Sequence, residues 1–125
     1  MDDNSQEYVI SKLDYAIFRP TGTYTFDEAV DLINRALEYC RSRTIRKLLV
    51  NILDVTGFPP PNTIQRFVFA TTWAETAKGK VVLAMVAPEK LIDPEKIGVT
   101  VAYNRGFETE VFTVEDEAVQ WLTTF

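Results

Sequence analysis

The chain has 125 residues, of which 46% are apolar and 25% charged, proportions typical of a single globular domain. Its 18 acidic and 13 basic residues give a net charge of −5, which argues against nucleic-acid binding, because that function depends on Lys and Arg. There is no histidine and only one cysteine, Cys40. The sequence therefore excludes Ser-His-Asp and Cys-His pairs, histidine-containing zinc sites and internal disulfides.

No apolar run approaches the ~20 residues that a membrane helix needs, so we expect no membrane insertion. A lone thiol fits a reducing compartment, and we expect a cytoplasmic protein. We further expect one domain over residues 1–125, with a flexible tail at 1–6. No catalytic residues, cofactor or metal are expected.

The first part of the chain predicts a hairpin followed by a helix. Residues 8–13 and 15–19 are rich in β-branched and aromatic residues on either side of Asp14. Thr25 and Glu28 have the spacing of a capping box, which predicts a helix start. The apolar residues that follow form one stripe, consisting of Phe26, Val30, Ile33, Leu37 and Cys40. Because Cys40 lies in this stripe, we expect a packed thiol and not a nucleophile.

The middle of the chain predicts two buried strands separated by a helix. Residues 48–53 and 80–87 are apolar runs typical of strands covered on both faces. Between them, a stiff proline-rich loop at 54–63 leads into a helix at 62–78. Asn62 or Thr63 is expected to cap this helix, and Gly79 to end it.

The last part predicts helix, strand and helix. Asp93 and Pro94 are typical of a helix start, and this third helix extends towards Asn104, although residues 97–101 also fit a strand. A short strand at 109–112 follows, and Thr113 is expected to cap a final helix. The whole order, β-β-α-β-α-β-α-β-α, predicts an α/β fold with a mixed, mostly parallel sheet of about five strands and about four helices.

Phosphate-binding loops of the dinucleotide and P-loop types are absent from the sequence. Asp54, at the end of a predicted strand, invites comparison with a phosphate-accepting receiver domain. The matching position on the other strand, at residues 19–22, carries no carboxylate for a Mg²⁺ site. We therefore expect Asp54 to be a turn residue that bonds nearby backbone amides.

Several short segments resemble one family. GTYTFDEA at 22–29 resembles the glycine and helix start of STAS domains, and LVNILDVTGF at 49–58 resembles their apolar strand and the turn after it. GKVVLA at 79–84 resembles their next strand. NRGF at 104–107, VF at 111–112 and EAVQWL at 117–122 are similar to the SpoIIAA-like branch of STAS/SEC14-type proteins. The resemblance spans roughly residues 8–122.

The resemblance implies a non-enzymatic fold that binds regulatory partners, with a switch loop that here contains Asp54, Thr56, Asn62 and Thr63. Partner-switching STAS proteins carry a phosphorylated serine at the start of their second helix. That position falls on Ile64, which cannot accept phosphate. Thr63 beside it has a hydroxyl, but the displaced pattern argues against a switch.

The helix at 62–78 is apolar around most of its circumference, so it must bury more than one face. Ile64, Phe67, Val68, Thr71 and Ala74 cover one arc, and Phe69 and Trp73 lie nearly opposite. One interpretation is that Trp73 packs against a neighbouring helix of the same domain. The other is that Phe69 and Trp73, with Phe58 beside them, form an exposed partner-binding patch.

Two function classes follow from these patterns. The first is a protein-binding or regulatory module that uses helix 62–78 and loop 54–63, with a second copy of the chain as the simplest partner. The alternative is a carrier of a small apolar ligand in a SEC14-like cavity. A carrier requires an apolar cavity inside the fold, whereas a docking module requires a filled core and an outer apolar patch.

Overall fold

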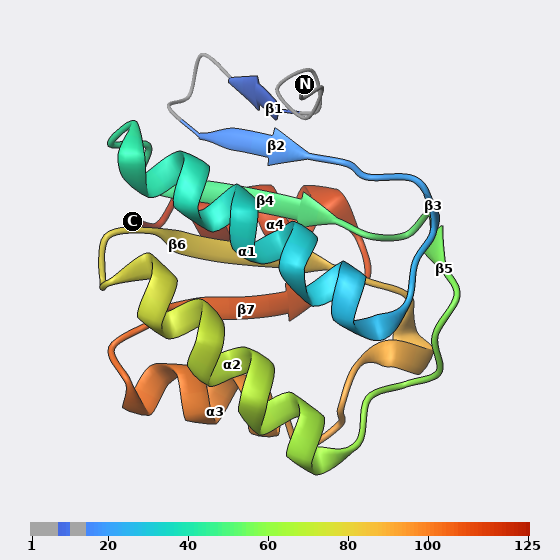
Figure 1. Ribbon diagram of the computed structural model, residues 1–125. Helices are drawn as coiled ribbons and strands as arrows, with labels where there is room; N and C mark the ends of the chain where they lie inside the picture. The colour runs from blue at the N-terminus through green and yellow to red at the C-terminus, as the bar shows by residue number, and fades with distance from the viewer. Residues whose placement is uncertain (1–7, 11–14) are drawn as a thin grey trace.

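Five strands form the central sheet of the protein, whose structure is a computed structural model that describes residues 8–10 and 15–125 (Figure 1). In order across the sheet they are β1 Tyr8–Ile10, β2 Ala16–Phe18, β4 Lys47–Asn51, β6 Val82–Val86 and β7 Thr109–Phe112. β1 and β2 pair antiparallel, whereas β2, β4, β6 and β7 pair in parallel. The predicted mixed, mostly parallel sheet is confirmed.

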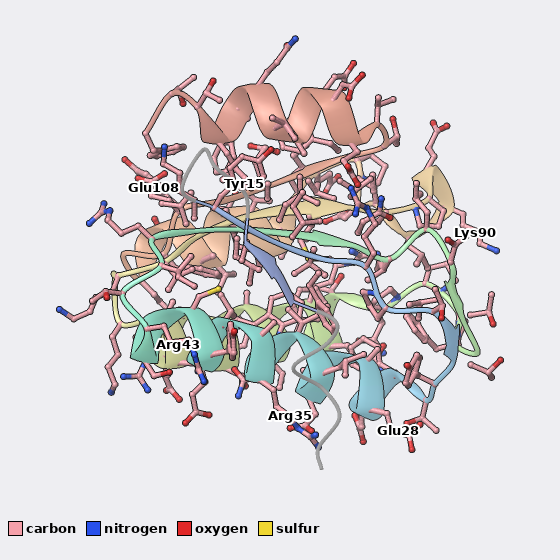
Figure 2. All side chains as sticks on the ribbon, turned by 90° about the horizontal axis from the view of Figure 1, so that it is seen from above. Tyr15, Glu28, Arg35, Arg43, Lys90 and Glu108 are labelled. Carbon is pink, nitrogen blue, oxygen red and sulfur yellow. The ribbon has the colours of Figure 1, made fainter. Side chains whose placement is uncertain are left out.

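Helices cover both faces of this sheet. α1 (Phe26–Ser42), α2 (Thr63–Ala77) and α3 (Ile97–Asn104) lie on one face, and α4 (Glu115–Leu122) lies on the other (Figure 1). Figure 2 shows the sheet between α1 and α4, with Glu28, Arg35 and Arg43 on the outer side of α1. The protein is thus a three-layer α/β sandwich.

Alternation along β4 supplies one core on each side of the sheet, because successive strand residues point to opposite faces. Leu48 and Val50 are fully buried in the core beneath α1, α2 and α3. Leu49 is fully buried in the second core, beneath α4, together with Leu122. This arrangement explains why the strand is apolar without interruption.

α1 forms as the sequence predicts. The Thr25 hydroxyl accepts a hydrogen bond from the Glu28 amide at 3.1 Å, and the Glu28 carboxylate accepts one from the Thr25 amide at 2.9 Å. Cys40 is fully buried on the inner side of the helix. Burial raises the pKa of its thiol to about 12, which fits a packed side chain.

A second, two-stranded sheet was not predicted. β3 (Gly22–Thr23) pairs in parallel with β5 (Val55–Thr56), and ties the chain before α1 to the loop before α2. Gly57, just after β5, has a φ of 116°, and a Cβ there would lie 2.3 Å from the Tyr24 carbonyl oxygen. Only glycine fits this crossing of two backbones.

Two predicted helix starts need correction. α3 begins at Ile97, three residues after Pro94, and its N-cap position is held by Lys96, which makes no side-chain cap. Asp93 is therefore not the N-cap, although its Oδ2 accepts the Ile97 amide at 2.9 Å. The alternative strand at 97–101 is wrong. Thr113 does not cap α4, because the N-cap position is held by Val114, which makes no side-chain cap. Predictions for residues 1–7 and 11–14, including the tail, lie outside the described residues.

Candidate functional site

The first turn of α2 is fixed by side-chain caps. The Asn62 side-chain Oδ1 accepts the Gln65 amide at 2.8 Å, and the Gln65 side-chain Oε1 accepts the Asn62 amide at 2.9 Å. Asn62 is therefore the predicted cap, and Thr63 is the first helical residue. Arg66 strengthens this corner, because its Nε donates to the Pro61 carbonyl at 3.1 Å.

The loop at 54–63 is held at its other end by the small sheet. The Gly22 amide donates to the Asp54 carbonyl at 3.2 Å, and the Thr23 and Thr56 hydroxyls are 3.2 Å apart. We expected the Asp54 side chain to accept hydrogen bonds from backbone amides of this turn. Asn51 does so instead, because its Oδ1 accepts the Leu53 amide at 2.9 Å. Asn51 lies closer to the strand end, so its side chain reaches the turn first.

The inner face of α2 carries the aromatic pair that the sequence singled out. Trp73 is only 6% exposed, and its indole Nε1 donates to the Val30 carbonyl of α1 at 3.1 Å. The Phe69 and Trp73 rings have centroids 4.6 Å apart. The expected exposed patch is wrong for Trp73, which packs against α1 within the same fold. A helical wheel shows two apolar arcs but does not say which one meets the sheet.

A mostly apolar pocket of about 120 Å³ lies between α1, α2, α3 and the sheet. It extends past the carboxyl ends of β4 and β6, where Ile52 and Ala87 line it. Open α/β sheets commonly bind ligands at this end of their strands. Phe58, Phe69 and Trp73 all line the pocket. The structure thus brings the three predicted partner-binding residues together, but around an internal space.

The polar residues that line this pocket carry two charges of each sign. Lys96 and Glu110 form an ion pair with an Nζ–Oε2 distance of 2.6 Å. Asp93 accepts hydrogen bonds from the Ile97 and Glu95 amides, and the first of these is the main reason why its pKa is lowered. The charge of Arg66 lowers the Asp93 pKa further. These four residues balance one another, so the polar part of the pocket has no net charge.

The outer face of α2, by which we mean Ile64, Phe67 and Val68, is unusually apolar for an exposed surface. Ile64 is 74% exposed, Val68 55% and Phe67 47%. The guanidinium carbon of Arg105, just after α3, lies 5.6 Å from the centroid of the Phe67 ring. The sequence identifies this arc as apolar without showing that Ile64, Phe67 and Val68 are exposed, and Ala74, which it assigns to the same arc, is buried. Trp73 packs against α1, and the two arcs lie on nearly opposite sides of the helix. Ile64, Phe67 and Val68 therefore face away from α1.

Among residues 8–10 and 15–125, no three His, Cys, Asp or Glu side chains gather where they could hold a metal. Within the same residues, no helix is long and apolar enough to cross a bilayer.

This architecture is the STAS-type fold. It is similar to a solved structure of the anti-sigma factor antagonist SpoIIAA in its unphosphorylated form, with a TM-score of 0.52 over 94% of this chain and 97% of that one. The two sequences are 10% identical, so the likeness shows the fold alone. No protein-family model and no curated protein matches the chain. The resemblance seen in the sequence is therefore confirmed at the level of fold.

Proposed function

We propose that this protein is a non-enzymatic, STAS-like binding module that docks another protein chain through the outer face of α2. One observation carries the proposal: three large apolar side chains, Ile64, Phe67 and Val68, are exposed on adjacent turns of one helix. Exposed apolar groups that cluster on a rigid element commonly mark an interface. The loop 54–63 leads directly into this helix.

The fold supports a regulatory role. SpoIIAA is an anti-sigma factor antagonist, and by analogy this chain acts on a regulatory protein in the cytoplasm. The buried thiol of Cys40, with its raised pKa, supports a function without covalent catalysis. Thiolate nucleophiles require accessible sites that lower the thiol pKa.

Phosphorylation is not part of the proposed function. Counted on from Asp54, the resemblance assigns Ile64 to the position of the phosphorylated serine in partner-switching STAS proteins, and Ile64 is the most exposed residue of the outer face. An apolar side chain there keeps the surface permanently suited to docking. Thr63 is exposed at the first position of α2, where a phosphate is electrostatically favourable. Release of a bound partner on stoichiometric phosphorylation of Thr63 would contradict this part of the proposal.

The simplest partner is a second copy of the chain, and sedimentation velocity over a wide concentration range tests it. Val68→Glu places a charge in the centre of the outer face, and we expect association to weaken about tenfold or more. Val114→Glu is the matched control, because Val114 is 48% exposed at the start of α4, on the other side of the sheet. A monomer at every concentration would exclude self-association. Equal weakening by both variants would remove the outer face as the site.

The pocket favours a second candidate function: we propose that the fold also carries a small apolar ligand. A docking module alone has no need of an apolar space lined by α1, α2, α3 and the sheet. Phe58, Phe69 and Trp73 would then bind the ligand and not a protein. Native mass spectrometry of gently purified protein tests this candidate, because a retained ligand adds a defined mass that organic solvent removes.

A further inference from the structure

We infer that the pocket takes a neutral molecule with a single aromatic ring, whose ring lies among Phe58, Phe69 and Trp73 and whose oxygen accepts a hydrogen bond from Arg66. The inference rests on the carrier function proposed above and names its ligand class. It follows from the size of the pocket, its walls and its polar residues.

Size limits the ligand to about one ring. The pocket volume is about 120 Å³. A cavity of about 150 Å³ in a protein core is known to hold benzene. A long acyl chain does not fit into this volume, so a membrane lipid is not the expected occupant.

The walls favour an aromatic ring over a branched aliphatic group. Phe69 and Trp73 form one wall, with their rings inclined at 32°, and Phe26 stands 6.1 Å from Phe69. The Phe58 ring meets Phe26 at 73°, an edge-to-face arrangement. Aromatic side chains pack preferentially against other rings in such offset and edge-to-face geometries. A bound ring thus extends a cluster that already exists.

The charged residues determine the polar end of the ligand. Lys96 is paired with Glu110, and Asp93 is bonded to two backbone amides. Arg66 uses its Nε for the Pro61 carbonyl, and its two Nη groups donate to no acceptor within the described residues. Because the four charges balance, the pocket favours neither a cation nor an anion. The Nη donors therefore suit an alcohol or carbonyl oxygen on an otherwise apolar molecule.

Trp73 provides the readout, with benzyl alcohol and toluene as probes. The chain has two tryptophans, and Trp121 packs with Phe112 and Phe125 in the layer that contains α4. In a ¹H–¹⁵N spectrum, we expect benzyl alcohol to shift the Trp73 indole signal saturably and to leave that of Trp121 in place. The expected dissociation constant is on the order of 1 mM, as befits a ligand of this size. Trp121→Phe assigns the two signals.

Two variants test the geometry. Arg66→Met should raise the dissociation constant of benzyl alcohol about tenfold and leave that of toluene unchanged, because only the alcohol accepts from the guanidinium. Val99→Phe fills the pocket from α3 and should abolish both shifts, whereas Val114→Phe, outside the pocket, should preserve them. If Val99→Phe does not fold, Ala87→Leu fills the pocket from the sheet side.

The outcomes separate the inference from the function on which it rests. If 1-octanol shifts the Trp73 signal and neither aromatic probe does, the ligand class is wrong and the carrier function stands. If no apolar probe shifts the Trp73 signal, both the ligand class and the carrier function are wrong. A shift that survives in a folded Val99→Phe or Ala87→Leu variant places the ligand elsewhere and overturns the site. An unchanged benzyl alcohol affinity in Arg66→Met overturns the role of Arg66.

Discussion

Replacing Trp73 by alanine distinguishes a structural tryptophan from an interface one. An interface residue can be truncated without harm to the fold, whereas a residue that joins α2 to α1 cannot. Trp73 is buried, and its Nε1 donates to the Val30 carbonyl at 3.1 Å. We therefore expect the variant to lose stability as an isolated monomer.

The size of the loss follows from the contacts. Truncation of a buried Trp to Ala typically costs about 3–5 kcal/mol. One side of the Trp73 ring borders the pocket and already lacks packing partners, so we expect the lower end, about 3 kcal/mol. This is a large share of the roughly 5–15 kcal/mol that stabilises a typical domain. At about 4 °C per kcal/mol for a chain of this length, the melting temperature should fall by about 12 °C.

Urea denaturation followed by circular dichroism measures this loss at low protein concentration. Phe67→Ala is the matched control, since Phe67 lies on the same helix but is 47% exposed. Its truncation should cost about 1 kcal/mol, because only part of its apolar surface is removed from water. Equal midpoints for the two variants would refute the assignment of inner and outer faces. A wild-type midpoint for Trp73→Ala would restore the interpretation of Trp73 as an interface residue.

Three further predictions concern caps, the thiol and pH. Asn62→Ala removes the capping box of α2 and should cost about 1 kcal/mol in urea denaturation; Asn62→Asp, which retains a capping oxygen, should cost less. Cys40 should react with a thiol reagent at pH 8 only as fast as the protein unfolds, because burial raises its pKa to about 12; prompt reaction of the native protein would contradict its packing. A hydrogen bond from Arg19 is the main cause of the lowered pKa of Glu115, so this pair contributes stability at neutral pH that is lost as the pH falls through the lowered pKa. Arg19→Met should flatten this acid dependence, and an unchanged pH profile would show that the pair contributes nothing.

Features encoded by neighbouring residues were predictable from the sequence. The capping boxes at Thr25 and Asn62 join residues three positions apart, so their spacing is visible in the sequence. Strand β4 lies in an unbroken apolar run, which is equally visible. The β3–β5 sheet was not predictable, because it pairs two-residue segments separated by a helix and a strand. No local pattern marks so short a strand.

The two faces of α2 show a different limit of sequence analysis. The helix has two apolar arcs, and both interpretations of Trp73 fitted its spacing equally well. Its position depends on a hydrogen bond to a carbonyl 43 residues away, which no spacing rule contains. The pocket was likewise foreseen only as an alternative, because its walls come from α1, α2, α3 and the sheet together. One available signal was the need of a buried indole N–H for an acceptor.

Hydroxyl-radical footprinting of the native protein tests most directly the claim that α2 turns its outer face towards a partner and its aromatic pair inward. Fragmentation of the modified peptide resolves oxidation at Phe67 from oxidation at Trp73. We predict that Phe67 is oxidised in dilute protein and becomes protected as the concentration rises, while Trp73 stays protected throughout. Oxidation of Trp73 in dilute native protein would contradict the assignment of the two faces, and oxidation of Phe67 that does not change with concentration would contradict a second copy of the chain as the partner.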